Sequence, residues 1–243
     1  MYRDSHINPN SQQRRQRFNR TVHNADWVIA GNQYLREKVP HSRVSIIPTP
    51  IDMQRYHAKI YRNEGKVVTL GWIGSKSTLA YLLDLKGVLE EIGRNFINVQ
   101  LKIVCDTFFD CQHLRVIKKP WRYEEEIEDL HSFDIGLMPL SDDIWSRGKC
   151  AFKLLQYLAV GVPVVASPIG MNSEVVHNHK NGFLALNEHE WLEWLKLLIQ
   201  DQDLRRQLGQ KGRELIKKDY ALHLHSHRMG NLFSRYENNM FGK

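Results

Sequence analysis

The sequence predicts an α/β fold, with a Rossmann-like parallel sheet that has helices on both faces. Beyond residue 66, apolar strand patterns alternate regularly with amphipathic helical stretches, an order typical of parallel strands joined by right-handed crossovers. The chain has 243 residues, of which 42% are hydrophobic and 10% are aromatic, which are globular values. We therefore expect a folded protein with a core large enough for such a sheet.

The first 50 residues predict a β-α-β unit that has no beginning. Strand patterns cover residues 26–30 and 44–47, and a helix pattern between them covers residues 33–39 and stops at Pro40. The preceding residues 1–24 are polar and rich in arginine. They could form a solvated helix, a contact with a membrane surface or nucleic acid, or a frayed arm.

A domain boundary is expected after this unit, because the following stretch up to Gly65 has scattered charge and no periodicity. We therefore predict an N-terminal remnant at residues 1–50, a linker at 51–65 and a main domain at 66–243. In the main domain we expect strands at 67–73, 99–105, 116–117, 135–139 and 162–167, helices at 77–93, 124–131 and 149–160, and two C-terminal helices. Ligands of such sheets bind beyond the carboxyl ends of the strands, which directs attention to the loops after Ile73, Pro139 and Ser167.

Net charge and cysteine content indicate the kind of partner and the cellular compartment to expect. A net charge of +7 and a pI near 9.3 favour anionic partners, such as nucleotide diphosphates, nucleic acid or acidic lipids. Three cysteines fit no zinc or haem spacing and predict reduced thiols in the cytoplasm. We expect no signal peptide, because the N-terminus is polar and rich in arginine. We expect no membrane span, because the most apolar run, residues 157–171, is short and is interrupted by Gly161 and Pro163.

The first strand of the main domain ends in the motif GWIGS, residues 71–75. Gly74, Ser75 and Thr78 would lie at the start of the next helix, where free amides and short hydroxyls can bind phosphate. An ordinary helix cap explains the same residues equally well. The motif lacks the three-glycine dinucleotide fingerprint and the P-loop lysine, which disfavours a dehydrogenase or a standard nucleotide hydrolase.

The helix expected at residues 149–160 places Lys149, Lys153 and Gln156 along one face. Phe152, Leu155 and Leu158 would then face the sheet. Lysines near a helix start oppose the helix dipole, so a bound diphosphate would relieve an unfavourable interaction. The alternative is a solvated lysine face.

Other polar clusters carry weaker signals. Glu174 suits the first turn of the next helix with or without a ligand. His223, His225 and His227 alternate without an acidic ligand set, so we expect no metal site. No nucleic-acid-binding motif is present, and nucleic acid is not an expected partner.

Residues 148–176, GKCAFKLLQYLAVGVPVVASPIGMNSEVV, resemble the signature of glycosyltransferase family 4, the group 1 glycosyltransferases of the GT-B fold. GWIGS and the segment SIIPTPID, residues 45–52, support the resemblance. It covers the chain from about Asn24 to Tyr220, and it implies that the main domain is the C-terminal, donor-binding half of a GT-B enzyme.

The resemblance implies sugar transfer from a nucleotide-diphosphate sugar of the UDP or GDP type, usually with retention of configuration. The sugar nucleotide is the substrate, and no other cofactor or metal is implied. Lys149 and Lys153 would stabilise the departing diphosphate, and Glu174 would lie near the donor sugar. Trp121 would lie near the base and Gln156 near the ribose. The implied binding residues are Gly74, Ser75, Thr78, Trp121, Gln156, Gly170, Met171 and Asn172.

Two departures from the family pattern leave alternatives open. Gly148 and Gln156 occupy the positions of two glutamates in the family pattern. The sequence also predicts only a small part of the N-terminal domain with which the family binds its acceptor. We therefore expect weak or no transfer by this chain alone, which would be either a truncated glycosyltransferase or one that a second chain completes. A non-catalytic nucleotide-sugar-binding or scaffold subunit and a GT-B epimerase are the alternatives. The family implies a saccharide or lipid-linked acceptor, polysaccharide biosynthesis, and peripheral contact with the inner face of a membrane.

Overall fold

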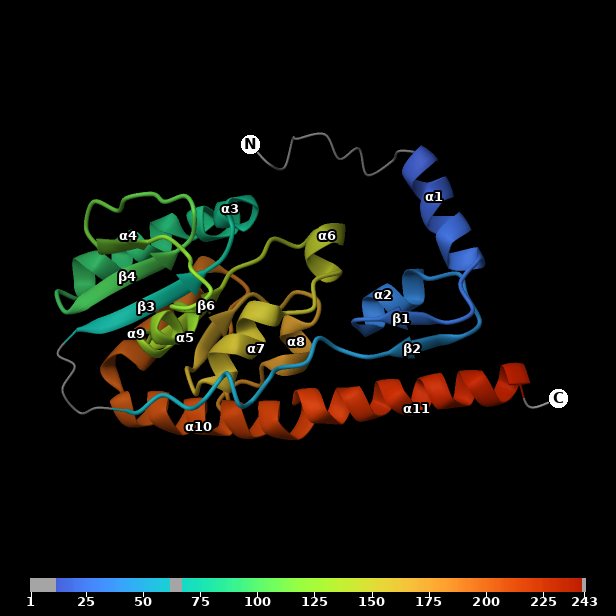
Figure 1. Cartoon of the computed structure of the whole chain (residues 1–243). Coiled ribbons are helices and arrows are strands. Elements are labelled where there is room, and N and C mark those ends of the chain that lie inside the picture. The colour runs from blue at the N-terminus through green and yellow to red at the C-terminus, as the bar shows by residue number, and fades with distance from the viewer. Residues whose placement is uncertain (1–11, 62–66, 242–243) are drawn as a thin grey trace.

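The structure, a computed structural model, describes residues 12–61 and 67–241 and contains two parallel sheets. One has two strands, in the order β1-β2, and the other has six, in the order β5-β4-β3-β6-β7-β8 (Figure 1). Every ladder between neighbouring strands is parallel. The predicted α/β fold with a parallel sheet is therefore confirmed.

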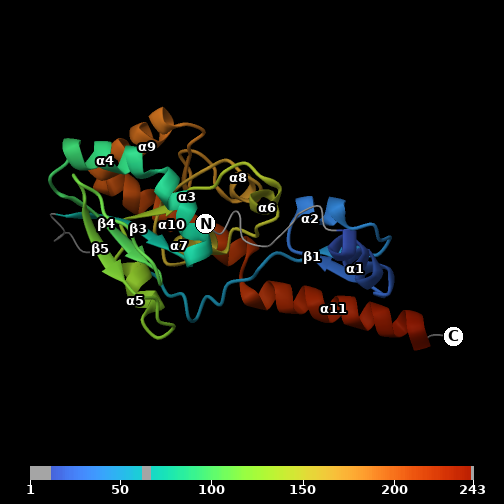
Figure 2. The same cartoon turned by 90° about the horizontal axis from the view of Figure 1, so that it is seen from above.

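The N-terminal unit contains the two-stranded sheet and lies beside the main sheet (Figure 1). Its elements are α1 (Gln12–His23), β1 (Val28–Ala30), α2 (Gln33–Lys38) and β2 (Val44–Ile46). Helix α1 is exposed except at Val22, as in the solvated-helix alternative. The long C-terminal helix α11 (Leu222–Phe241) runs alongside this unit (Figures 1 and 2), and Asp26 raises the pKa of the Tyr236 hydroxyl.

The order of the six-stranded sheet reverses beside its central strand. From β3 (Val68–Ile73) the chain adds strands on one side and then returns to add the others on the opposite side. The remaining strands are β4 (Val99–Val104), β5 (Arg115–Lys119), β6 (Ile135–Met138), β7 (Val164–Ala166) and β8 (Gly182–Leu184). The reversal opens a crevice at the carboxyl ends of the central strands, where ligands of such sheets bind.

Helices cover both faces of this sheet, as predicted. Leu70 and Trp72 belong to one buried cluster and Ile73 to the other, because successive side chains of a strand point to opposite faces. Figure 2 shows α4 and α9 on one face and α5 on the other. The main-domain helices are α3 (Lys76–Asp84), α4 (Lys86–Asn95), α5 (Glu126–His131), α6 (Ile144–Arg147), α7 (Phe152–Ala159), α8 (Asn172–Val175), α9 (Glu188–Gln200) and α10 (Gln202–Asp219).

Three helix predictions were wrong. The helix expected at 77–93 is two helices, because Leu85 leaves the helical conformation at ψ 1°. The helix expected to open at Lys149 begins at Phe152, because Ala151 adopts a left-handed conformation with φ 51°, which interrupts a right-handed helix. Three C-terminal helices, α9, α10 and α11, stand where two were expected.

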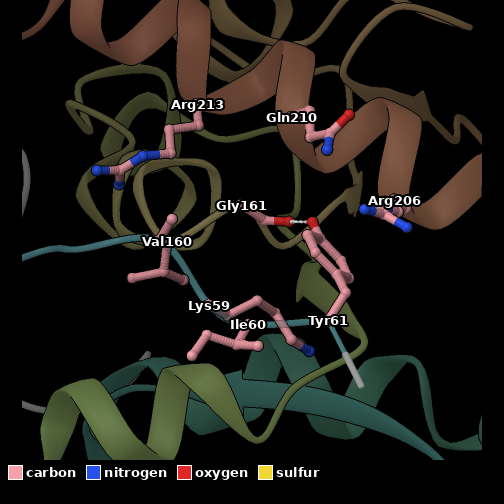
Figure 3. A pocket seen from close by; sticks show the side chains of 9 residues that line it. Lys59, Ile60, Tyr61, Val160, Gly161, Arg206, Gln210 and Arg213 are labelled. Atoms are coloured by element: carbon pink, nitrogen blue, oxygen red, sulfur yellow. Dashed lines mark hydrogen bonds between the residues drawn. The ribbon is translucent and has the colours of Figure 1, made fainter. Parts of the chain in front are cut away.

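The described part of the expected linker, residues 51–61, forms an irregular segment across the main domain, which we call the strap. The Ile51 backbone pairs with Ala221, and the Lys59 N–H donates to the Val160 carbonyl at 2.9 Å. Further along, the Tyr61 hydroxyl donates to the Gly161 carbonyl and borders a cavity of about 310 Å³ (Figure 3). The strap thereby joins the turn between α7 and β7 to helix α10.

Close backbone packing at this junction gives a stability prediction. A Cβ atom at Gly209 of α10 would lie 1.9 Å from the Gly161 carbonyl oxygen. We expect Gly209→Ala to lower the free energy of unfolding by about 1–3 kcal/mol, because the backbone must move apart. Gly230→Ala in α11 is the matched control, since its Cβ would meet nothing within 4 Å.

In the control, helix propensity alone should raise the free energy of unfolding by up to about 1 kcal/mol. Denaturant unfolding of both variants measures the difference. Equal stabilisation by the two alanines would show that α10 does not pack as described.

Candidate functional site

A cavity of about 480 Å³ lies at the carboxyl ends of β3, β4 and β5. Its volume falls within the usual range of small-molecule sites, and it adjoins the end of β3, the strand beside which the strand order reverses. Strands, loops and the starts of α5 and α7 all contribute to its wall. The lining residues are Ile73, Gly74, Ser75, Asp106, Pro120, Trp121, Glu126, Phe152, Lys153 and Gln156.

The loops around this cavity differ in part from the prediction. The loop after Ile73 contributes Gly74 and Ser75, as expected. The loops after Pro139 and Ser167 contribute no lining residue, whereas the loop after β5 contributes Trp121. Phe152, which was expected to face the sheet, is 44% exposed and lines the cavity instead, because α7 starts later than the pattern indicated.

Lys153 of α7 lines this cavity. Its Nζ donates to Thr78 Oγ1 at 2.9 Å and lies 4.3 Å from the centre of the Trp72 ring. A Cβ atom on Gly74 would come within 2.5 Å of the same Nζ, so only glycine leaves room for it. Burial, assisted by the nearby charge of Lys149, lowers the pKa of Lys153 to about 7.

Lys149 lies outside the helix, in the segment before α7. Its Nζ packs 4.1 Å from the centre of the Tyr81 ring, and burial lowers its pKa to about 8 against the opposing charge of Asp143. Asn32 of the N-terminal unit holds this segment, since its Nδ2 donates to the carbonyls of Gly148 at 3.3 Å and Lys149 at 3.1 Å. In the described part of the chain neither Lys149 nor Lys153 forms an ion pair with a carboxylate, so both charges can serve an anion.

The start of α3 carries the hydroxyl groups expected from the sequence. Thr78 Oγ1 accepts a hydrogen bond from the Ser75 N–H at 3.2 Å, as in a capping box. The Lys76 N–H donates to Asp106 Oδ1 at 2.9 Å. Ser75 Oγ takes part in the cap and shares a hydrogen bond with Ser77 Oγ at 2.8 Å. Ser75 and Lys153 both line the cavity, so the helix cap does not conflict with a phosphate site there.

The opposite end of the cavity contains a polar network. Trp121 Nε1 donates to Glu126 Oε2 at 3.1 Å, and its ring is 47% exposed. Gln156 Nε2 donates to the Tyr56 hydroxyl at 2.9 Å, which donates in turn to Glu126 Oε1 at 2.7 Å. Trp121 and Gln156 therefore line the same end of one cavity.

Glu126 and Tyr56 were missed by the sequence analysis. Glu126 lies four residues before the buried Leu130, so helical spacing places the two on one face of α5 and could have indicated a buried carboxylate. Tyr56 lies on the strap, whose irregular backbone has no period that predicts an inward side chain. Only the tertiary structure brings this hydroxyl to the site.

Residues 170–174 lie away from the cavity lining. Gly170 has φ 54°, and a Cβ atom there would lie 2.8 Å from the Arg147 carbonyl. Met171 is buried, and Asn172 Nδ2 donates to the Ser167 carbonyl at 3.0 Å. Glu174 is exposed. These four predicted residues adjoin the segment that leads to Lys149 but do not line the cavity that contains Lys153.

The described residues contain neither a group of metal-ligating side chains nor a membrane-spanning helix. Within them, no three histidine, cysteine, aspartate or glutamate side chains form a group that could hold a metal ion. No helix among them has both the length and the apolar character needed to cross a membrane.

Sequence comparison relates the site to one family. Residues 122–215, which include α5, β6 and α7, match the family described as glycosyl transferases group 1. No curated protein matches the chain. The matched residues contain Glu126, Lys149, Lys153 and Gln156, and so include one wall of the cavity.

Solved structures resemble the chain over more of its length. Sucrose-phosphate synthase from Thermosynechococcus elongatus has a TM-score of 0.73 at 15% identity, over 97% of this chain and 64% of that chain. HepE from Anabaena, in complex with UDP and glucose, has a TM-score of 0.71 at 15% identity, over 90% of this chain and 66% of that one. The C-terminal domain of a group 1 glycosyl transferase, LpcC from Francisella tularensis, has a TM-score of 0.59 at 14% identity, over 71% and 99% of the two chains.

These similarities establish the fold. The chain spans less than two thirds of the length of the sucrose-phosphate synthase structure, whereas it covers nearly all of the separate LpcC domain. The main sheet and its helices therefore have the Rossmann-like fold of one half of a GT-B glycosyltransferase, and residues 122–215 carry the match to group 1.

Proposed function

We propose that this protein is a glycosyltransferase that moves a sugar from a nucleotide-diphosphate sugar to an acceptor. The observation that carries the proposal is the ammonium group of Lys153, half-buried beside the cavity, with Lys149 nearby and no carboxylate partner in the described chain. A buried cation without an anion is costly, and a bound diphosphate would supply that anion. The match to group 1 and the UDP and glucose named for the HepE structure support the same ligand class.

The two lysines provide what the departure of a diphosphate requires. Negative charge builds up on the leaving oxygen as the bond to the sugar breaks, and preorganised cations stabilise it most in a site that excludes water. Lys153 and Lys149 would carry this role, together with the hydroxyls of Ser75 and Thr78. Transfer by this arrangement needs no metal, and we propose that it retains the configuration of the sugar.

The rest of the donor would extend along the cavity from Lys153. Trp121 offers an exposed aromatic face to the base, and Gln156 lies one helical turn from Lys153 on α7. The donor sugar would lie toward Gly170, Met171 and Glu174, on the side of the Lys149 segment. UDP and GDP sugars are the proposed donors.

A second candidate function is nucleotide-sugar binding without transfer, as a scaffold subunit. It is favoured by Gly148 and Gln156, which replace the two glutamates of the family pattern. Mass-spectrometric detection of a glycosylated saccharide or lipid-linked acceptor separates the two candidates. Product formed with a UDP or GDP sugar supports transfer, and donor binding without product on any acceptor supports the scaffold. The acceptor, the contact with a membrane and a second polypeptide that completes the enzyme are parts of the first candidate.

Replacement of Lys153 tests the phosphate site. We expect Lys153→Ala to weaken binding of UDP or GDP by about tenfold to a hundredfold, because a hydrogen bond to a charged group is lost. Lys218→Ala, which removes an exposed lysine on α10, is the control for the change in net charge. Isothermal titration gives the dissociation constants, and unaltered binding by Lys153→Ala would contradict the assignment.

The lowered lysine pKa values predict a pH dependence of donor binding. Lys153 and Lys149 lose their protons near pH 7 and pH 8 in the free protein, and a diphosphate binds the protonated forms. Affinity for a UDP sugar should therefore be highest below pH 7 and should fall by about tenfold or more up to pH 9. Titrations between pH 6 and pH 9 measure this profile.

Lys153→Arg is the matched variant for the pH profile, because arginine stays protonated throughout this range. Its affinity should fall less steeply, with only the contribution of Lys149 left. A wild-type affinity that is constant from pH 6 to pH 9 would contradict the role of these lysines.

A further inference from the structure

We infer that Glu126 recognises the ribose of the bound nucleotide, supplying from α5 the carboxylate that α7 lacks. The inference rests on the proposed function, since it assigns one end of the same cavity. Gln156 of α7 brings only a neutral amide to this end of the cavity, whereas Glu126 of α5 brings a carboxylate.

The side chain of Glu126 is built into the cavity wall. Only 8% of it is exposed, and it lines the cavity beside Trp121 and Gln156. Described donors approach both carboxylate oxygens: Oε1 accepts from the Tyr56 hydroxyl and from Arg55 at 3.3 Å, and Oε2 accepts from Trp121. A carboxylate has about four acceptor positions, so the described chain leaves one on Oε2 for a ligand.

The hydrogen bonds around Glu126 all point toward its carboxylate. Gln156 donates to Tyr56, and Tyr56 donates to Glu126, so that each donor strengthens the next. Arg55 of the strap also forms an ion pair with this carboxylate, with 3.3 Å between its guanidinium and Oε1. Such a group accepts a further hydrogen bond from a neutral hydroxyl strongly.

The position of Glu126 relative to Lys153 selects the ribose. Gln156 follows Lys153 by three residues on α7, about one turn along the helix. A diphosphate at Lys153 therefore places the adjoining ribose near Gln156 and Glu126. The exposed ring of Trp121, hydrogen-bonded to Glu126 through its Nε1, then lies at the base end.

Binding of nucleotides with and without ribose hydroxyls tests this inference. The probes are UDP, GDP and their 2′,3′-dideoxy analogues, with inorganic pyrophosphate as the probe of the phosphate end. We expect the wild-type protein to bind the ribonucleotides about tenfold more tightly than the dideoxy forms, the effect of one hydrogen bond to a charged acceptor. Glu126→Gln should lose this preference and bind pyrophosphate as the wild type does.

Glu128→Gln is the matched control, because it makes the same change on the exposed side of α5. It should keep the wild-type preference. Retention of the ribose preference in Glu126→Gln would overturn the inference alone, as would a change only in the discrimination between UDP and GDP. A parallel loss of pyrophosphate binding in Glu126→Gln would mean that this residue only supports the fold. Failure of the wild type to bind any nucleotide would overturn the proposed function as well.

Discussion

The ladders between β3 and its two neighbours determine where everything else in the main domain lies. β3 pairs with β4 along its whole length and with β6 at Leu70 and Gly71, and all six of its residues are buried. A strand covered on both faces and paired on both edges can present a ligand only with the loop at its end. That loop carries Gly74 and Ser75 to the cavity.

Glycines at close contacts allow the rest of the site to approach this strand. The ring of Phe133 lies where a Cβ atom of Gly71 would be, and Trp72 and Lys153 surround the corresponding position of Gly74. The lysine of α7 can therefore reach across to Thr78 of α3. The same contact explains the lowered pKa of Lys153, since the protein replaces the water that would solvate its charge.

The buried side chain of Asn32 connects the N-terminal unit to this site. Asn32 caps α2 by accepting the Leu35 N–H at 2.8 Å, and its amide group donates to the segment that precedes α7. That segment passes through the left-handed conformation of Ala151. The start of α2 and the segment before α7 thus fix the position of Lys149 together. The strap brings Tyr56 and Arg55 to the opposite end of the cavity.

The sequence by itself determined the α/β fold, because strand and helix periodicities are local properties that reflect burial. It also identified Lys153 and Gln156 as members of one helix face, and the glycine loop after β3. Only the tertiary structure decided that Lys149 lies outside α7. Ala151 adopts a left-handed conformation there, and Asn32 donates a hydrogen bond to the nearby Lys149 carbonyl. It also decided that Glu126 and Tyr56 lie together beside Gln156. Tyr56 and Glu126 are 70 residues apart in the sequence, and their contact depends on the irregular path of the strap.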